Sequence, residues 1–336
     1  MLQDKLNRPL RDLRISVTDR CNFRCHYCMP ADVFGHSYQF LHRQQILSFE
    51  EIVRLTTILV VQGVRKIRLT GGEPLLRHQL QSLVSKIAAI DGVADIALTT
   101  NGYLLSKYAL PLYEAGLKRL TVSLDTLNPD RFKVLAGVGL ELSQLMAGIE
   151  RALEIGFERM KLNTVIQKGV NDDEITAIAN FGRQRGLICR FIEYMDVGNL
   201  NHWSFDDVVT AKDIITRISK RWPLVPVEAN YSGEVASRYR YQDGFGEVGI
   251  IASVTRPFCG DCTRMRLSAD GSIYTCLFAE KGFDIKTPMR NGASDSELAA
   301  MLSDLWRARD DMYSELRFSE GERRERKKVE MYHIGG

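Results

Sequence analysis

Six of the seven cysteines in this 336-residue chain fall into two short groups. The first cysteine group is Cys21, Cys25 and Cys28, and the second cysteine group is Cys259, Cys262 and Cys276. Three thiolates can bind one soft metal centre, but they are one short of the four ligands that close a structural site. Each group therefore predicts a metal site with an open position, where a small molecule can bind.

Both groups also have a purely structural interpretation. The first could be a zinc knuckle completed by His26, and the second a structural zinc site whose fourth ligand is Cys189 or His333. Cys189 lies in an apolar strand context, which is more typical of a packed core residue. Clustered cysteines do not resemble a disulfide framework, so metal ligation in a reducing compartment is the favoured interpretation.

Two arginines follow the second cysteine group directly. Residues two apart share one face of an extended segment, so Arg264 and Arg266 should point the same way and offer bidentate donors to phosphate oxygens. The alternative is a pair of solvated arginines on a strand. Because an open metal site lies next to them, we favour a site for a phosphorylated substrate that completes the metal coordination.

The elements that must position these residues alternate between strands and helices. Apolar or β-branched runs predict six strands, at Leu13–Thr18, Lys66–Thr70, Asp95–Thr99, Arg119–Leu124, Lys161–Ile166 and Ile188–Tyr194. Amphipathic stretches predict helices at Phe49–Gln62, Gln79–Ile90, Leu104–Ala115, Leu142–Ile155 and Asp173–Arg185. This alternation predicts βαβ units and a parallel sheet, either open or closed into a barrel.

Polar residues should then gather beyond the carboxyl ends of the strands, where such folds carry their chemistry. The first cysteine group, Gly71-Gly72-Glu73-Pro74, Thr99–Gly102, Asp125 and Met195-Asp196 all follow predicted strands. The pattern breaks after residue 196. There we expect a helix at Ala211–Arg221, antiparallel strands within 231–255, a hairpin turned at Asp270-Gly271, a helix at Asp295–Arg309 and a mobile charged tail from 317 to 336.

The composition excludes several classes of protein. Charged residues make up 26%, with 45 Lys and Arg against 42 Asp and Glu, so the net charge predicts neither a nucleic-acid partner nor a membrane partner. The longest apolar runs are too short to span a bilayer, and the N-terminus is too polar for a signal peptide. We therefore expect a cytoplasmic protein.

The first cysteine group, followed by Gly-Gly-Glu-Pro after the next strand, resembles the radical S-adenosylmethionine (SAM) superfamily. The resemblance implies an α/β fold, a partial (βα)6 TIM-like barrel of the radical SAM type with a C-terminal cluster-binding α+β section. It implies a 4Fe-4S cluster on the first cysteine group, with its fourth iron chelated by SAM. It also implies that Gly71, Gly72 and Glu73 contact the methionyl amine of SAM and that Tyr27 lies along its adenine.

Within that superfamily the whole chain resembles the GTP 3',8-cyclase family of molybdenum-cofactor biosynthesis. The resemblance rests on residues 11–25, 67–74, 191–198 and 256–267 and on the terminal Gly335-Gly336. It implies a second 4Fe-4S cluster on the second cysteine group, whose free iron binds the guanine of GTP. The implied SAM-binding residues are Tyr27, Gly72, Ser123 and Met195. The implied GTP-binding residues are Arg14, Arg68, Thr99, Lys161, Arg264 and Arg266, with Lys66 a further candidate.

The resemblance implies a lyase that converts GTP to (8S)-3',8-cyclo-7,8-dihydroguanosine 5'-triphosphate, the first step of molybdenum-cofactor (molybdopterin) biosynthesis. The implied partners are cyclic pyranopterin monophosphate synthase downstream and a reductant such as flavodoxin or ferredoxin, and a homodimer is one open assembly. We expect a barrel over residues 1–240 and a C-terminal section over 241–336, whose terminal Gly335-Gly336 inserts into the active-site cavity.

Two other functions fit parts of the pattern. A radical SAM enzyme that modifies a peptide would share the first cysteine group, although such enzymes usually carry more C-terminal cysteines and would leave Arg264 and Arg266 without a role. A zinc-stabilised binding module would use both cysteine groups as structural sites. Iron and sulfide content separates these classes.

Overall fold

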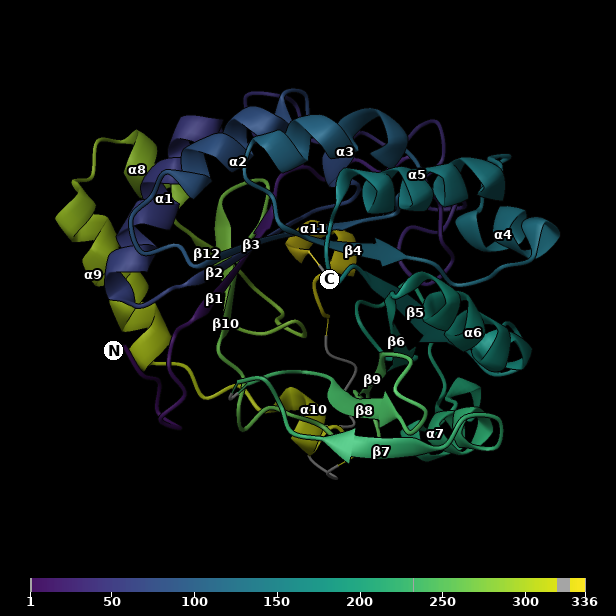
Figure 1. Ribbon diagram of the computed structural model, residues 1–336. Coiled ribbons are helices and arrows are strands. Elements are labelled where there is room, and N and C mark those ends of the chain that lie inside the picture. The colour runs from purple at the N-terminus through teal and green to yellow at the C-terminus, as the bar shows by residue number, and fades with distance from the viewer. Residues whose placement is uncertain (1, 232, 319–326, 336) are drawn as a thin grey trace.

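A single twelve-stranded sheet organises the computed structural model, which describes residues 2–231, 233–318 and 327–335 (Figure 1). The strands are β1 (Asp12–Ser16), β2 (Lys66–Thr70), β3 (Asp95–Thr100), β4 (Arg119–Ser123), β5 (Lys161–Ile166), β6 (Ile188–Glu193), β7 (Leu224–Val227), β8 (Ser237–Tyr241), β9 (Glu247–Ile251), β10 (Arg264–Leu267), β11 (Ser272–Tyr274) and β12 (Phe283–Asp284). They lie in the order β12-β11-β10-β1-β2-β3-β4-β5-β6-β9-β8-β7.

Strands β1 to β6 pair in parallel in sequence order, as the βαβ pattern predicts. Two later strands extend this parallel core, because β9 pairs with β6 and β10 pairs with β1. The strand order ends at β12 and β7, so the part of the sheet that the structure describes is not closed. The expected partial barrel is confirmed.

The helices lie mainly outside the sheet (Figure 1). Their bounds are α1 (Phe49–Gln62), α2 (Leu80–Ala88), α3 (Leu105–Glu114), α4 (Pro129–Ala136), α5 (Leu142–Ile155), α6 (Ile175–Arg185), α7 (Ala211–Ser219), α8 (Lys286–Arg290), α9 (Asp295–Arg307), α10 (Tyr313–Leu316) and α11 (Met331–Ile334). Short 3-10 helices lie at Pro74–Leu76, Asp172–Glu174 and Phe205–Asp207. Each predicted helix is present within a few residues of its expected bounds.

The sequence analysis did not predict α4, although its start carries two ordinary signals. The Asn128 side chain accepts hydrogen bonds from the backbone of Asp130 and Arg131, and Pro129 occupies the first helical position. The helix is only eight residues long and buries three of them, so its periodicity is weak. Strands β7 and β12 and helices α8, α10 and α11 also lack strong periodicity and lie outside the predicted elements, whereas β10 and β11 are the two strands of the predicted hairpin at Asp270-Gly271.

The C-terminal section adds to both edges of the sheet. Strands β7 and β8 pair antiparallel beyond β9, and β11 and β12 pair antiparallel beyond β10. The hairpin between β10 and β11 turns at Asp270-Gly271 as predicted, with Gly271 at φ +83°. The predicted boundary at residue 240 lies inside β8, and the division into 1–240 and 241–336 stays a prediction.

The end of the chain differs from the mobile tail that we expected. Residues 331–334 form α11, and Ile334 is fully buried. Of the tail residues, 319–326 and Gly336 lie outside the described residues.

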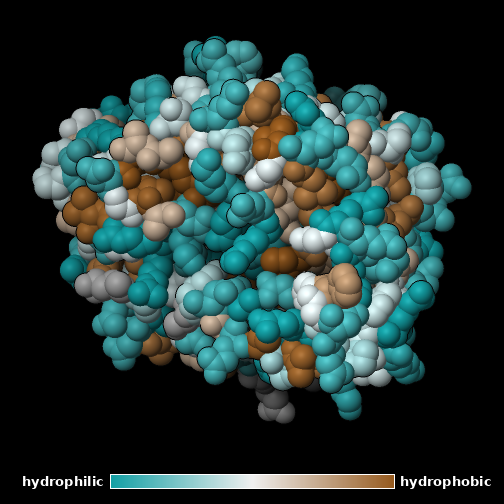
Figure 2. All heavy atoms as spheres, viewed as in Figure 1, coloured by the Kyte–Doolittle hydropathy of each residue, from teal (hydrophilic) through white to brown (hydrophobic). Residues whose placement is uncertain are grey.

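The surface in this view carries hydrophobic residues in small separate groups among hydrophilic ones (Figure 2). Among the described residues, no helix combines the length and the apolar character that a membrane span requires.

Candidate active site

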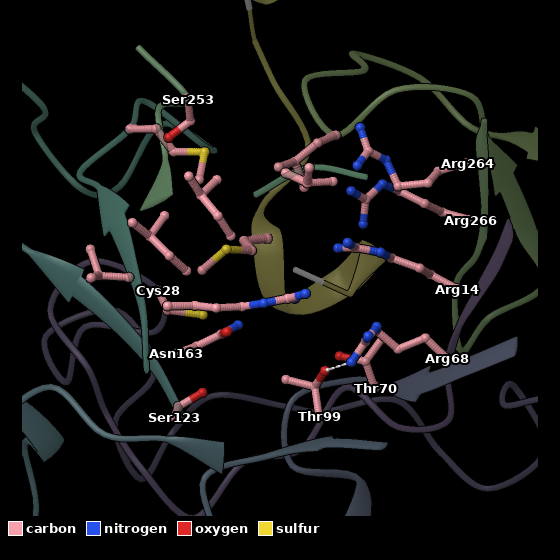
Figure 3. A pocket seen from close by; sticks show the side chains of 18 of the residues that line it. Arg14, Cys28, Arg68, Thr70, Thr99, Ser123, Asn163, Ser253, Arg264 and Arg266 are labelled. Atoms are coloured by element: carbon pink, nitrogen blue, oxygen red, sulfur yellow. Dashed lines mark hydrogen bonds between the residues drawn. The ribbon is translucent and has the colours of Figure 1, made fainter. Parts of the chain in front are cut away.

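A cavity of about 360 Å³ lies inside the barrel (Figure 3). All six grouped cysteines line it. Most of the predicted site residues line the same cavity, namely Arg14, Tyr27, Lys66, Arg68, Gly71, Gly72, Thr99, Ser123, Met195, Arg264 and Arg266. Glu73 and Lys161 are buried close by but do not line the cavity. Residues from both ends of the chain thus surround one space.

The glycine turn after β2 packs against the backbone that leads into the first cysteine group. The backbone N–H of Gly72 donates to the carbonyl of Thr18 over 2.8 Å, and that of Glu73 donates to the carbonyl of Arg20 over 2.7 Å. A Cβ atom at Gly71 would lie 2.5 Å from the Thr18 carbonyl oxygen, and φ there is +148°. Only glycine allows this close approach, which fixes where the cysteine loop begins.

The carboxyl group of Glu73 holds two loops together. It accepts hydrogen bonds from the backbone N–H of Leu75 and Asn101 and from the hydroxyl of Thr100, over 2.7 to 3.0 Å. Burial raises the pKa of Glu73 to about 7. The side chain therefore joins the turn after β2 to the turn after β3, and the expected contact of Glu73 with SAM stays a prediction.

Tyr27 and α4 position the rest of the first cysteine loop. The Tyr27 hydroxyl donates to Asp125 Oδ2 over 2.6 Å, and the backbone N–H of Val165 donates to Asp125 Oδ1 over 2.8 Å. The backbone N–H of Arg24 donates to the carbonyl of Ala136 at the end of α4 over 2.7 Å. The loop is therefore tied to the ends of β4 and β5 and to a helix.

Burial outweighs nearby positive charge at the thiols of the first cysteine group: the guanidinium of Arg24 lowers the pKa of Cys21 but does not offset burial. Burial raises the pKa of Cys21 to about 12 and raises the pKa values of Cys25 and Cys28 strongly. A thiol must lose its proton to bind a metal, so a metal bound by this group would have to supply the stabilising positive charge.

Three grouped cysteine thiols are a donor set that suits an iron–sulfur cluster. A 4Fe-4S cluster has four separate irons, so three thiolates can each bind a different one and leave the fourth open. Two groups of three soft thiols around one cavity have this chemistry.

The second cysteine group has a different electrostatic environment. Arg264 Nη2 donates to Cys262 Sγ over 3.2 Å. Burial alone would raise the pKa of Cys262, but the guanidiniums of Arg264 and Arg309 outweigh it and lower the pKa to about 6. Burial raises the pKa of Cys276 to about 12.

Three arginines lie side by side across three neighbouring strands. In the register of the sheet, Arg14 on β1 pairs with Arg68 on β2 and with Arg266 on β10, and we call these residues the arginine row. Figure 3 shows the guanidiniums of Arg14, Arg264 and Arg266 close together on one side of the cavity. Burial, followed by the charges of Arg266, Arg264 and Arg68, lowers the pKa of Arg14. Adjacent like charges destabilise a sheet, so the row indicates a site for a polyanion.

Arg68 and Lys161 lie near Arg14, Arg264 and Arg266, and we call these five residues the basic wall. Arg68 Nη1 donates to the hydroxyls of Thr99 and Thr121 over 2.9 and 3.2 Å. Burial lowers the pKa of Lys161 to about 7, helped by the charges of Arg190, Arg119 and Arg68.

The sequence analysis missed several cavity residues. Arg119 and Arg190 line the cavity from β4 and β6. A basic residue within an otherwise apolar strand is a signal that would have found Arg190. Tyr231 lines the cavity from the loop before β8, and Lys66 Nζ lies 2.9 Å from the centre of its ring. No signal in the sequence predicts that this loop lines the cavity.

The end of the chain reaches the arginine row. Arg266 Nη1 donates to the carbonyl oxygen of Gly335, and Met331 and Tyr332 line the cavity. Tyr332 is held by a hydrogen bond of 2.9 Å between its hydroxyl and that of Tyr38. The expectation for Gly336 falls outside the described residues.

Comparison with known proteins matches two family models and many full-length relatives. Residues 15–182 match the Radical SAM superfamily, and residues 187–315 match Molybdenum Cofactor Synthesis C. Proteins named GTP 3',8-cyclase from Acidothermus cellulolyticus, Xanthomonas axonopodis pv. citri and Staphylococcus epidermidis are 52%, 51% and 48% identical, covering 100% of this chain and 99% of each relative.

Solved structures support the fold. Streptococcus suis SuiB bound to S-adenosylmethionine has a TM-score of 0.59 at 16% identity, covering 93% of this chain and 68% of that chain. SuiB bound to precursor peptide SuiA has a TM-score of 0.61 at 15% identity, covering 93% of this chain and 67% of that chain. At such low identity these matches concern the fold alone. The sequence relatives decide the family: the chain belongs to the GTP 3',8-cyclase family of the radical SAM superfamily.

Proposed function

We propose that this protein converts GTP to (8S)-3',8-cyclo-7,8-dihydroguanosine 5'-triphosphate, the first step of molybdenum-cofactor biosynthesis. The observation that supports this most strongly is that the arginine row and both cysteine groups line one cavity. The relatives named GTP 3',8-cyclase at about 50% identity over the full chain point to the same reaction.

The first cysteine group would hold a 4Fe-4S cluster, with Tyr27, Gly72, Ser123 and Met195 around SAM. When bound, this cluster and SAM supply the reductive bond cleavage that starts radical chemistry. The chain itself fixes the cysteine loop through the glycine turn after β2 and through the hydrogen bond between Tyr27 and Asp125. The second cysteine group would hold the other 4Fe-4S cluster, facing the base of GTP.

The basic wall would bind the triphosphate. Arg14, Arg264 and Arg266 offer guanidinium donors. Arg266 is buried and the other two are half-buried, so solvent screens their attraction for an anion poorly. Arg68 is held in place by Thr99 and Thr121, so little ordering remains to be done when the nucleotide binds. Orientation of the ribose and exclusion of water are the contributions of the protein to the reaction.

The test uses anaerobically reconstituted full-length protein with reductant, SAM and GTP. We expect about eight irons per chain with matching sulfide, and formation of 5'-deoxyadenosine together with a cyclised guanosine product. Formation of 5'-deoxyadenosine without GTP would favour a peptide-modifying enzyme instead. Two zincs per chain and no sulfide would contradict the proposal altogether.

Finer points belong to the same proposal. The product would pass to cyclic pyranopterin monophosphate synthase, and flavodoxin or ferredoxin would supply electrons in the cytoplasm. A terminal Gly335-Gly336 that inserts beside the arginine row would be in keeping with the contact between Arg266 and the Gly335 carbonyl.

A further inference from the structure

A buried ion cluster lies directly behind the second cysteine group. Asp4, Arg8 and Arg309 form this group, which we call the N-terminal ion cluster. Arg8 Nε lies 2.6 Å and Arg309 Nη1 3.1 Å from Asp4 Oδ2, and the three side chains are at most 1% exposed. Asp4 Oδ1 also accepts the backbone N–H groups of Leu6 and Arg8, both over 2.9 Å.

Both arginines of this cluster bind the backbone of the cysteine loop. Arg8 Nη1 donates to the carbonyl oxygen of Cys259 over 2.8 Å, and Arg309 Nη1 donates to that of Cys262 over 2.7 Å. Trp306 contacts both arginines. Its Nε1 donates to the Arg8 carbonyl over 3.2 Å, and its ring lies 4.6 Å from the Arg309 guanidinium. The first residues of the chain are thereby joined to the loop that carries two of the three thiols.

The guanidiniums of this cluster lie against the cysteine loop. Arg8 and Arg309 share the fully buried carboxylate of Asp4, and Arg309 also pairs over 3.4 Å with Asp311, which is 32% exposed. Arg8 Nη2 is buried with no hydrogen-bond partner among the described residues. Two buried guanidiniums therefore lie in direct hydrogen-bond contact with the backbone of Cys259 and Cys262, where their field is poorly screened.

Reduction of an iron–sulfur cluster adds one negative charge. Nearby positive charge and hydrogen bonds stabilise the reduced form and raise the reduction potential. We propose that Asp4, Arg8 and Arg309 are positioning residues of the second cysteine group, which fix its loop and raise the reduction potential of the cluster bound there. This inference rests on the proposed function, because it requires the second cluster.

The test is a redox titration of reconstituted full-length protein, in which electron paramagnetic resonance monitors the second cluster. The second cluster is identified as the one whose signal changes when GTP is added. In Arg309→Gln we expect the ratio of reduced to oxidised second cluster at a fixed potential to fall about tenfold, which is about 59 mV for one electron. Arg309→Lys keeps the charge and should keep the ratio within about threefold of the unsubstituted protein.

Asp4→Asn should change the ratio in the opposite direction, because it removes the one negative charge between the two arginines. Arg307→Gln is the matched control: it removes an equal charge two residues away, at the end of α9, but its side chain is 64% exposed and solvent screens it. The first cluster provides an internal reference in every variant and should keep its potential.

Three outcomes overturn the inference. If Arg309→Gln and Arg309→Lys both lower cluster occupancy equally while the remaining second cluster keeps its potential, the arginine is only structural. If Arg307→Gln shifts the potential as much as Arg309→Gln, the effect is one of net charge. Absence of a GTP-sensitive second cluster in the unsubstituted protein would overturn the proposed function as well. The first two outcomes, in contrast, overturn only the inference about the N-terminal ion cluster. If Asp4→Asn does not fold, the two Arg309 variants still decide the matter.

Discussion

At the scale of single residues, the site brings together like positive charges whose mutual repulsion lowers the stability of the fold. The arginine row places three guanidiniums side by side in a buried sheet, and Lys161 lies near them with a pKa lowered to about 7. Such an arrangement costs stability unless an anion fills it. The arginine row and Lys161 therefore indicate a site for an anion. Binding of that anion should change the protonation state of Lys161.

Lys161 should take up a proton when GTP binds above pH 7. Its pKa of about 7 makes it largely neutral at pH 8, and a nearby phosphate would raise that pKa toward the ordinary value of 10.5. Calorimetry in buffers of different ionisation enthalpy should show uptake of about one proton at pH 8 and much less at pH 6, where the amine is already charged. Lys161→Met should abolish the uptake, whereas the exposed Lys133→Met should not. Unchanged uptake in Lys161→Met would remove Lys161 from the nucleotide site.

Substitution of a proposed cluster ligand should lower the iron content of the protein, whereas substitution of the core residue Cys189 should not. Cys28→Ala removes a proposed cluster ligand, so the protein should fall from about eight irons per chain to about four. Cys189→Ala is the control, because Cys189 is buried in the core with its Sγ 3.3 Å from the Ile178 carbonyl. It should keep all its iron, and loss of iron there would show that Cys189 is a ligand.

At the scale of elements, buried polar side chains fix the loops that carry the site. Glu73 joins the turns after β2 and β3, and Glu193 at the end of β6 joins that strand to α7 and to the segment after β9. Both carboxyl groups lie at most 1% exposed. Loop positions in this barrel therefore depend on a few buried acids as well as on the strands.

Glu193→Gln should destabilise the protein by about 1–3 kcal/mol, because it replaces a buried acceptor of four hydrogen bonds with a group that can accept fewer. Chemical denaturation of the apoprotein measures this. Glu50→Gln makes the same substitution in an exposed ion pair with Lys86 and should cost less than about 1 kcal/mol. Equal effects at the two positions would contradict the role given to Glu193.

Deletion of Gly335-Gly336 should abolish cyclisation and leave the iron content unchanged. The described part of this segment contacts the arginine row through the Gly335 carbonyl and is anchored by Tyr332, so its loss changes the cavity and neither cysteine group. Product analysis and iron determination on the truncated protein check this together. Full turnover after truncation would exclude the proposed insertion.

At the scale of the whole molecule, the second half of the chain adds strands to both edges of the parallel core, β1 to β6. β9 pairs with β6 and β10 pairs with β1, so the loop between β9 and β10 carries Cys259 and Cys262 along the open side of the sheet. The N-terminal ion cluster then connects the start of the chain to that loop. The site is built from residues that are far apart in sequence.

A protein ending at residue 240 should therefore fail to fold cooperatively. It would lose β9 and β10, the parallel partners of β6 and β1, and leave the backbone N–H and C=O groups at these two strand edges unpaired. Circular dichroism on heating and limited proteolysis should show a broad transition and rapid cleavage, compared with the full chain. A sharp transition would show that residues 1–240 fold independently.

The sequence by itself determined the local elements and the chemistry of the site. Periodicity and capping signals placed the six core strands and most helices, because those properties are local. The cysteine spacing and Gly71-Gly72 pointed to the superfamily for the same reason. Only the tertiary structure decided that β10 lies beside β1, which brings Arg266 next to Arg14, and that Asp4 and Arg8 lie behind Cys259. Such pairings depend on the packing of distant segments, which no local pattern records.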